Sequence, residues 1–315
     1  MTIKEISAVG VVGAGLMGAG LAQEFARGGY DVWIHDASSE MLASAPKRMR
    51  VALEMMAGLG MIEAGEVEPT LRRVRSTGEL ADLASRSEFV VEAVSENLDV
   101  KKKVFAALDR HCAPDVVLAS NTSALSPTAL GEATKRPDKV VVTHYFNPPY
   151  LLPAVEIVPG AKTSTGTLDL ARRLCESIGK QPVVMEREIV GFVINRLQYA
   201  LFREATWLVE NGYVSAEDLD RVVVGSLGNR LAVFGPFKIA DLGGLDVYDS
   251  ICDTVFPALS GGRESPSLMR NLVAEGKLGA KSGAGFYGWP SGGPEEARRR
   301  LAEHAAMMFA KGPKA

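Results

Sequence analysis

The feature that most constrains the fold is a glycine-rich turn, Gly13-Ala14-Gly15-Leu16-Met17-Gly18, which separates an apolar run from an amphipathic run of helix length. The apolar run covers residues 6–12 and predicts a buried strand. In this GxGxxG spacing the first glycine permits a tight turn, the second lets a ligand approach the backbone, and the third lets the helix pack on the strand. Free N–H groups at the start of such a helix face an anion. The turn therefore predicts a β-α unit that binds a phosphate group.

An acidic residue follows where a dinucleotide site needs one. Asp36 directly follows the second predicted strand, residues 31–35, and stands eighteen residues after Gly18. A carboxylate there accepts hydrogen bonds from the hydroxyls of the adenosine ribose and repels a 2′-phosphate. Positions 37–39 contain no arginine that would offset this repulsion. The pattern predicts NAD rather than NADP, and a glycine turn that serves packing alone is the alternative.

Short apolar runs alternate with helix-length runs over the first half of the chain. The strand candidates are residues 6–12, 31–35, 88–94, 116–120, 139–144, 154–158 and 182–186. Their apolar character and the β-α alternation predict a Rossmann-type, doubly wound parallel sheet between helices, an α/β fold. Helical runs follow at 190–211, 215–227, 236–242, 244–259, 266–275 and 294–310, with helix starts at Ser215 and Pro294. We therefore expect a Rossmann domain at residues 1–188 and a smaller all-α domain at residues 189–315.

Charge and cysteine usage exclude several classes of protein. The formal net charge is −3, the isoelectric point is near 5.9, and no sustained basic face for nucleic acid occurs. The basic runs Lys101-Lys102-Lys103 and Arg298-Arg299-Arg300 lie in amphipathic stretches, which predicts solvated helix faces. Charged residues within 189–211 exclude a simple membrane span. Three cysteines without metal-site spacing, and no signal-peptide pattern, favour a cytoplasmic protein without a metal.

The stretch VVVTHYFNPPY, residues 140–150, places a lone histidine at the end of a predicted strand. Ligands of such sheets bind outside the carboxyl ends of the strands, where Asn121 also falls. His144 is suited to accept a hydroxyl proton near neutral pH while a hydride leaves to a nicotinamide ring. Glu156, within the apolar run AVEIV, is costly to bury unless it is paired. These residues predict a His144–Glu156 pair, and a histidine satisfied within the core is the alternative.

Six stretches in a fixed order resemble the 3-hydroxyacyl-CoA dehydrogenase family. They are GAGLMG, VVEAVSEN, SNTSAL, HYFNPP, VEIV and GFVINR, and the resemblance extends over nearly the whole chain to KLGAKSGAGFY. It implies that His144 is the catalytic base and that Glu156 is its partner. It also implies that Ser123 and Asn195 contact the substrate oxygen, that the protein is a homodimer, and that it serves fatty acid metabolism.

The same resemblance implies contacts to NAD beyond the glycine turn. Glu96 and Lys101 match positions near the cofactor, and Asn147 follows the histidine as it does in the family. Lys281 is expected to approach the nicotinamide end. Asn121 joins this set because it lies at the carboxyl end of a predicted strand.

Several of these residues have simpler interpretations. Ser123 is a compact donor and acceptor suited to hold an alcohol, but it also suits a helix N-cap, for which Ser126 before Pro127 is the better candidate. Asn195 lies in an apolar helical run, where a structural hydrogen bond is the alternative to a substrate contact. For Glu96 the alternative is a solvated helix start.

The substrate is less constrained than the chemistry. Coenzyme A carries several negative charges and is usually bound by lysines or arginines. By resemblance, the basic residues belong in the helical excursion after the ribose-binding acid, but residues 51–68 are apolar and acidic here. The second half resembles the branch that includes lambda-crystallin (gulonate 3-dehydrogenase) and carnitine dehydrogenase. Arg230 would then pair with a free carboxylate, and a surface or interface arginine is the alternative.

Two further classes stay open at this point. A crystallin-like structural protein keeps the glycines and loses the catalytic set, whereas Ser123, His144, Glu156 and Asn195 are all present. A decarboxylating β-hydroxyacid dehydrogenase needs a catalytic lysine in the first helix of the second domain, where Asn195 and Arg196 stand instead. The expected protein is therefore an NAD-dependent dehydrogenase that acts on a 3-hydroxyacyl thioester or a related 3-hydroxy acid.

Overall fold

The computed structural model describes residues 6–309, which form two compact units. Residues 6–194 and 299–309 form the first unit, and residues 195–298 form the second. The sequence predicted domains at residues 1–188 and 189–315. In the structure the second unit begins at residue 195, and residues 299–309 of the last helix belong to the first unit.

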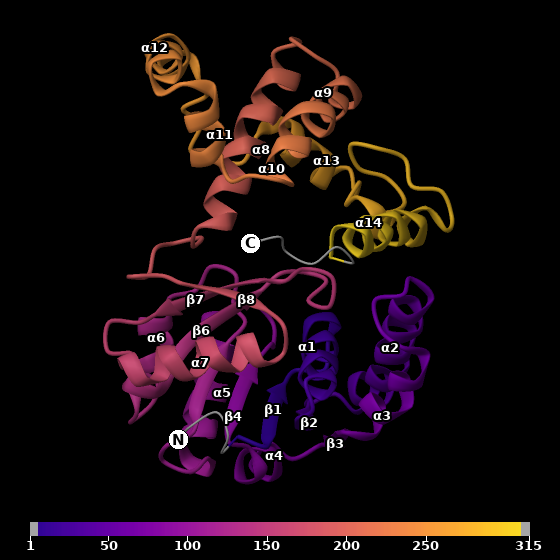
Figure 1. Cartoon of the computed structure of the whole chain (residues 1–315), viewed down its shortest axis with the longest axis vertical. Helices are drawn as coiled ribbons and strands as arrows, with labels where there is room; N and C mark the ends of the chain where they lie inside the picture. Colours follow the sequence, from indigo (N-terminus) through magenta and orange to yellow (C-terminus); the bar gives the residue numbers. More distant parts are fainter. Residues whose placement is uncertain (1–5, 310–315) are drawn as a thin grey trace. The chain divides into compact units, whose positions relative to one another are not determined.

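The first unit is built on an eight-stranded sheet with the order β3-β2-β1-β4-β5-β6-β7-β8 (Figure 1). The strands are β1 (Ala8–Val12), β2 (Asp31–His35), β3 (Val74–Thr77), β4 (Phe89–Glu92), β5 (Val117–Ser120), β6 (Val140–Tyr145), β7 (Ala154–Pro159) and β8 (Gln181–Val184). The first six strands follow the order of a dinucleotide-binding Rossmann fold, which confirms the predicted class. Within such a sheet a ligand binds where the order reverses, here between β1 and β4.

Two features of the sheet differ from the expectation. Strand β3 was not predicted, because its sequence VRST is polar and the strand lies at the edge of the sheet. Strand β7 runs antiparallel to β6, whereas the other neighbouring pairs are parallel. A parallel neighbour needs a long crossover, and only residues 146–153 separate β6 from β7.

Helices cover both faces of the sheet (Figure 1). They are α1 (Leu16–Arg27), α2 (Ser39–Gly58), α3 (Val67–Arg72), α4 (Leu80–Arg86), α5 (Leu98–His111), α6 (Pro127–Gly131) and α7 (Thr165–Ser177), with short 3₁₀ turns at Ala64–Glu66 and Pro137–Lys139. One core contains Val9 and Val11 of β1 with Phe25 of α1, and the other contains Val12 with Phe105 of α5. Alternate residues of β1 thus enter opposite cores, as a strand buried on both faces requires.

The second unit is helical. It contains α8 (Ile194–Glu210), α9 (Ala216–Val222), a π-helical segment (Val223–Gly228), α10 (Asn229–Leu231), α11 (Pro236–Gly243), α12 (Leu245–Val255), α13 (Ser267–Ala274) and the start of α14 (Gly293–Phe309), with 3₁₀ turns at Phe256–Ala258 and Ala280–Ser282. Two predicted N-caps are confirmed: Ser215 Oγ accepts the Asp218 N–H at 3.0 Å, and Ser126 Oγ accepts the Ala129 N–H at 3.1 Å. None of the helices in residues 6–309 combines the length and apolar character that a membrane crossing needs.

Residues 299–309 of α14 pack within the first unit. Ala302 and Ala305 are buried against Leu151 of the turn that follows β6. Partly buried side chains that border this cluster are Met55, Leu59, Met61 and Tyr150. The apolar stretch 51–68, which lacks the basic residues expected for coenzyme A, is therefore covered in part by a helix of the same chain.

Candidate active site

The glycine turn has the conformation that a dinucleotide cradle requires. Gly13 has φ +104°, and a Cβ at this residue would lie 2.5 Å from the Ala93 carbonyl oxygen. A Cβ at Gly18 would lie 1.7 Å from the Gly13 carbonyl oxygen, so the start of α1 packs on the turn only without a side chain. These two glycines are required by the fold itself.

Gly15 has a different role. The nearest heavy atom to a Cβ built there is Met41 Cε at 4.0 Å, so the protein leaves space over this residue. Gly15 is also the N-cap of α1, and no side chain caps the helix. The first N–H groups of α1 are therefore available to an anion that approaches over Gly15. The pyrophosphate of NAD binds in this way in Rossmann folds. The residues present fit the cofactor.

Asp36 joins the glycine turn to the end of β2. Its Oδ2 accepts the Ala14 N–H at 2.7 Å and its Oδ1 accepts the Ser38 N–H at 2.9 Å. Each carboxylate oxygen retains a lone pair for a ribose hydroxyl. Arg48 also lies beside the turn, but it donates to the backbone carbonyls of Ala14 and Met41. Asp36 thus lies at the end of β2, where dinucleotide folds place the carboxylate that binds the ribose, in agreement with NAD.

Lys101 lies in a buried polar network at the carboxyl ends of β4 and β5. Its Nζ is 2.7 Å from Glu92 Oε1 and 3.3 Å from the Val94 carbonyl oxygen, and its side chain is 1% exposed. Ser120 Oγ donates to the other Glu92 oxygen at 2.6 Å. The prediction of a solvated helix face is wrong for Lys101, because the C-terminal edge of the sheet supplies a buried carboxylate that the local pattern does not reveal. Loss of either charged partner leaves an uncompensated buried charge, at a cost of about 3–5 kcal/mol.

Glu96 connects this network to the loop that carries Ser123. Its Oε1 accepts the Ser123 N–H at 3.0 Å and the Thr122 hydroxyl at 2.5 Å, and its Oε2 lies 3.3 Å from Lys101 Nζ. Burial raises the pKa of Glu96, but these hydrogen bonds and the Lys101 charge outweigh burial, so the pKa is lowered overall. An ionised Glu96 therefore orders the loop after β5. This role goes beyond the solvated helix start that the sequence left open.

His144 and Glu156 face each other across the antiparallel strands β6 and β7. The two residues are register partners, and His144 Nδ1 lies 2.8 Å from Glu156 Oε2. The other oxygen, Oε1, accepts the N–H groups of Val193 and Ile194 at 2.8 and 2.9 Å. Burial raises the pKa of Glu156, and the hydrogen bonds from His144, Ile194 and Val193 overcome that effect and lower it. The stability that this carboxylate contributes is thus present above its unfolded-state pKa and is lost as the pH falls through the lowered folded-state pKa.

The ionised Glu156 fixes the tautomer of the histidine. A carboxylate accepts hydrogen bonds only, so His144 Nδ1 carries a proton and Nε2 of the neutral ring is left as an acceptor. Phe146 and Phe192 flank the imidazole, with ring centroids 4.7 and 5.6 Å from it. The arrangement provides a base that is oriented by a hydrogen bond to an anion and packed against two aromatic rings.

Three further residues of the first unit were predicted to contact NAD, and the structure shows where each of them lies. Asn121 is buried, and its Oδ1 accepts the Tyr145 N–H at 2.8 Å, which ties the ends of β5 and β6 together. Asn147 is exposed in the loop after β6. Leu16 is 61% exposed at the start of α1. Contacts of these three residues with NAD stay predictions.

Three predicted residues belong to the helical unit. Asn195 is the second residue of α8 and directly follows Ile194, whose N–H is bonded to Glu156. Arg230 lies in α10 and Lys281 in the 3₁₀ turn Ala280–Ser282, and both are exposed in their own unit. Their contacts with substrate or cofactor also stay predictions.

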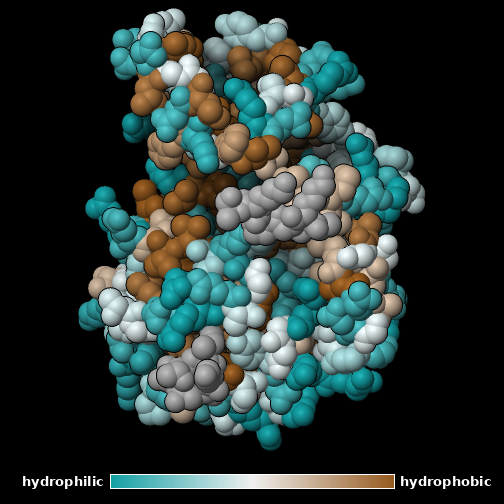
Figure 2. Space-filling view, viewed as in Figure 1, coloured by the Kyte–Doolittle hydropathy of each residue, from teal (hydrophilic) through white to brown (hydrophobic). Residues whose placement is uncertain are grey.

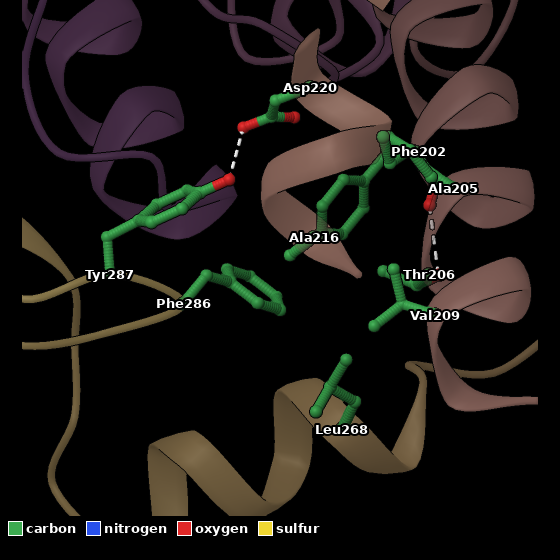
Figure 3. A pocket seen from close by; sticks show the side chains of 10 residues that line it. Phe202, Ala205, Thr206, Val209, Ala216, Asp220, Leu268, Phe286 and Tyr287 are labelled. Carbon is green, nitrogen blue, oxygen red and sulfur yellow. Dashed lines mark hydrogen bonds between the residues drawn. The ribbon is translucent and has the colours of Figure 1, made fainter. Parts of the chain in front are cut away.

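The helical unit contains an apolar cavity of its own, of about 190 Å³ (Figure 3). Its polar groups include Asp220, whose carboxylate accepts the Tyr287 hydroxyl at 2.6 Å. This hydrogen bond from Tyr287 to Asp220 is the main reason that the pKa of Tyr287 rises to about 12. No histidine, cysteine or lysine lines the cavity.

Together, the Rossmann sheet, the open glycine cradle and the oriented histidine define an NAD-dependent dehydrogenase. Comparison with known proteins agrees: residues 8–189 match the NAD binding domain of 3-hydroxyacyl-CoA dehydrogenase, and residues 191–289 match the C-terminal domain of the same enzyme. The chain belongs to the 3-hydroxyacyl-CoA dehydrogenase family, as its sequence motifs predicted.

Individual relatives differ in their named substrates. The 5-formyl-3-hydroxy-2-methylpyridine 4-carboxylate 5-dehydrogenase of Mesorhizobium japonicum is 34% identical over 96% of this chain and 96% of its own length. A 3-hydroxybutyryl-CoA dehydrogenase of Mycobacterium tuberculosis is 36% identical over 90% of this chain and 98% of its own length. A solved structure of the first kind of enzyme, described as an NAD⁺-dependent dismutase, superposes with a TM-score of 0.90 at 32% identity and covers 98% of this chain and 99% of its own.

Substitution of two glycines by alanine separates cofactor binding from folding. Gly15→Ala is expected to weaken NAD binding about tenfold or more at an unchanged melting temperature, because its methyl group meets only the space the pyrophosphate needs. Gly18→Ala is the matched control and should lower the melting temperature, because its methyl group meets the Gly13 carbonyl. Calorimetric titration with NAD and thermal unfolding measure the two effects. Unchanged NAD affinity in Gly15→Ala would contradict the assignment.

Proposed function

We propose that this chain oxidises a hydroxyl group β to a carboxyl or thioester carbonyl, with His144 as the general base. The observation that carries the proposal is the hydrogen bond of 2.8 Å between His144 Nδ1 and Glu156 Oε2 at the carboxyl edge of a Rossmann sheet. It leaves Nε2 able to accept a proton where the ligands of such sheets bind.

The residues of this chain then divide the chemistry between them. His144 Nε2 takes the hydroxyl proton, and Glu156 stabilises the imidazolium that forms. Ser123 and Asn195 hold the substrate oxygen while the alcohol becomes a carbonyl. Bound NAD supplies the hydride acceptor. Glu96 and Lys101 order the adjoining loop through the contacts described above.

Replacement of the base tests this assignment. His144→Asn should lower kcat on the order of 10² to 10⁴-fold, the usual contribution of a general base, while the dissociation constant of NAD changes little. His111→Asn is a matched control, because His111 is exposed at the end of α5 and should leave kcat unchanged. Steady-state NADH formation gives kcat, and a nearly normal kcat in folded His144→Asn would disprove the proposal.

The substrate class has two candidates. The family points to a 3-hydroxyacyl-CoA thioester, which would place the chain in fatty acid metabolism. Helix α14 favours a free carboxylic acid as the substrate. The match to the 3-hydroxyacyl-CoA dehydrogenase family ends at residue 289, before α14 begins at Gly293, so the helix is not part of the region shared with the family. The dismutase structure covers 98% of this chain and hence part of α14, and its named substrate is a free acid. Helix α14 also covers apolar residues of 51–68, a stretch that offers coenzyme A no basic residues.

A parallel assay decides between the two classes. L-3-hydroxybutyryl-CoA and L-gulonate, which carry the hydroxyl group, are each supplied with NAD, and NADH formation is measured. 5-Formyl-3-hydroxy-2-methylpyridine 4-carboxylate is assayed in parallel, because the hydrate of its formyl group would supply the same O–H proton and C–H hydride. For a free acid, Arg230→Gln should raise KM about tenfold through loss of a charge-assisted hydrogen bond. Arg263→Gln, another exposed arginine of the helical unit, serves as control. Turnover of the thioester alone, with no effect of Arg230→Gln, would exclude the free-acid candidate.

We also propose a cytoplasmic homodimer that associates through the helical unit. Of residues 195–298, all of which the structure describes, Thr206 alone is buried. Large apolar side chains gather on this unit (Figure 2), among them Phe237, Leu242 and Leu245, which are 87%, 71% and 62% exposed. A patch of this kind is typical of an interface between subunits. Unpaired Cys112, Cys175 and Cys252 support a reducing compartment.

The mass in solution tests the dimer. Light scattering should give twice the chain mass of 33.6 kDa, and the double substitution of Phe237 and Leu245 by Glu should shift the mass toward that of one chain. Val51→Glu, at an apolar residue that is 59% exposed on α2, is the control and should leave the mass unchanged. A wild-type mass of a single chain would overturn the proposal.

A further inference from the structure

Phe192 has an unusual backbone for a residue with a large side chain. Its φ is +49°. Among the residues that the structure describes, no other residue except glycine has a positive φ. This left-handed region is disfavoured when a Cβ is present. The preceding Gly191 also has positive φ, +78°, so the chain reverses sharply just before α8 begins. A conformation of this kind persists only when the surrounding contacts hold it.

The ring of Phe192 is held on the same side of the sheet as the catalytic pair. It is 1% exposed and packs with Val142 of β6 and Val158 of β7. Val142 lies two residues before His144, and Val158 lies two residues after Glu156. Side chains two apart in a strand point to the same face, so the Phe192 ring fills the space beside the pair, with its centroid 5.6 Å from the imidazole.

The backbone after Phe192 acts on Glu156. The N–H groups of Val193 and Ile194 both point at Glu156 Oε1, at 2.8 and 2.9 Å. Successive N–H groups beside a left-handed residue form a concavity that binds an anion. The turn thus occupies one oxygen of Glu156 and leaves the other, Oε2, for His144 Nδ1.

We propose that Phe192 is a positioning residue for the His144–Glu156 pair. Its left-handed backbone turns two N–H donors onto Glu156, and its ring closes one side of the imidazole against water. The proposal rests on the proposed role of His144 as the general base. Phe192 touches neither the transferred proton nor the hydride, so it acts on the reaction through the orientation of His144.

Two matched substitutions separate this role from ordinary packing. Phe192→Leu removes the ring and retains an apolar side chain, and it should lower kcat about tenfold while KM for NAD changes less than twofold. Phe89→Leu removes an equally buried ring at the amino end of β4 and should lower the melting temperature without lowering kcat. The assay uses whichever of the three substrates of the parallel assay the wild type oxidises.

Combination with His144→Asn distinguishes failure of this inference from failure of the proposed function. If Phe192 acts through His144, then Phe192→Leu lowers kcat in the wild type and has no further effect in His144→Asn. An equal effect in both backgrounds overturns the inference. If His144→Asn itself keeps normal kcat, then the proposed function fails. If His144→Asn is inactive but Phe192→Leu has normal kcat, then only the positioning role fails.

A spectroscopic measurement requires no substrate. The chain has four histidines, so the ¹H–¹⁵N signals of labelled protein are few, and the signal absent in His144→Asn identifies His144. The Nδ1 proton should exchange slowly with water in the wild type and in Phe89→Leu, and it should exchange at least tenfold faster in Phe192→Leu. Equal exchange in the two variants would show that the ring does not protect the pair.

Discussion

The candidate site depends on one pairing, the antiparallel register of β6 and β7 that sets His144 opposite Glu156. The other neighbouring strands of the sheet are parallel, and the ligands of such sheets bind outside the carboxyl ends of the strands. Reversal of β7 brings a buried carboxylate back to that same edge, beside His144, the penultimate residue of β6. The sheet itself therefore fixes the distance between base and carboxylate, and rigid strands hold a site more precisely than loops do.

A second buried carboxylate organises the cofactor side of the edge. Glu92 ends β4 and is paired with Lys101 of α5 and Ser120 of β5, so three elements meet at one charge. Glu96 continues this network to the loop of Ser123. Because both charges of the Glu92–Lys101 pair are removed from water, the pair is a demanding constraint on how these elements pack. We infer that it preserves the shape of the edge on which NAD and the hydroxyl substrate would meet.

Helix α14 lies outside the part of the chain that the family shares. The glycine cradle, His144 and Glu156 lie within the region matched by the family, whereas α14 packs on Leu151 in the turn that follows β6 and lies beyond that region. Relatives that share the core and differ in named substrate, a thioester in one and a pyridine carboxylate in another, agree with this division.

The sequence by itself determined the Rossmann class, the cofactor and the family, because glycine spacing, strand apolarity and Asp36 are local signals with a direct physical cause. It also indicated that Glu156 needs a partner. Tertiary structure decided the rest: that β7 runs antiparallel, that Lys101 is buried, that α14 covers part of 51–68, and that the Phe192 turn bonds Glu156. Each of these features depends either on contacts between residues far apart in the chain or on a local reversal of the backbone. Long-range contacts and backbone reversals leave no periodic pattern in the sequence.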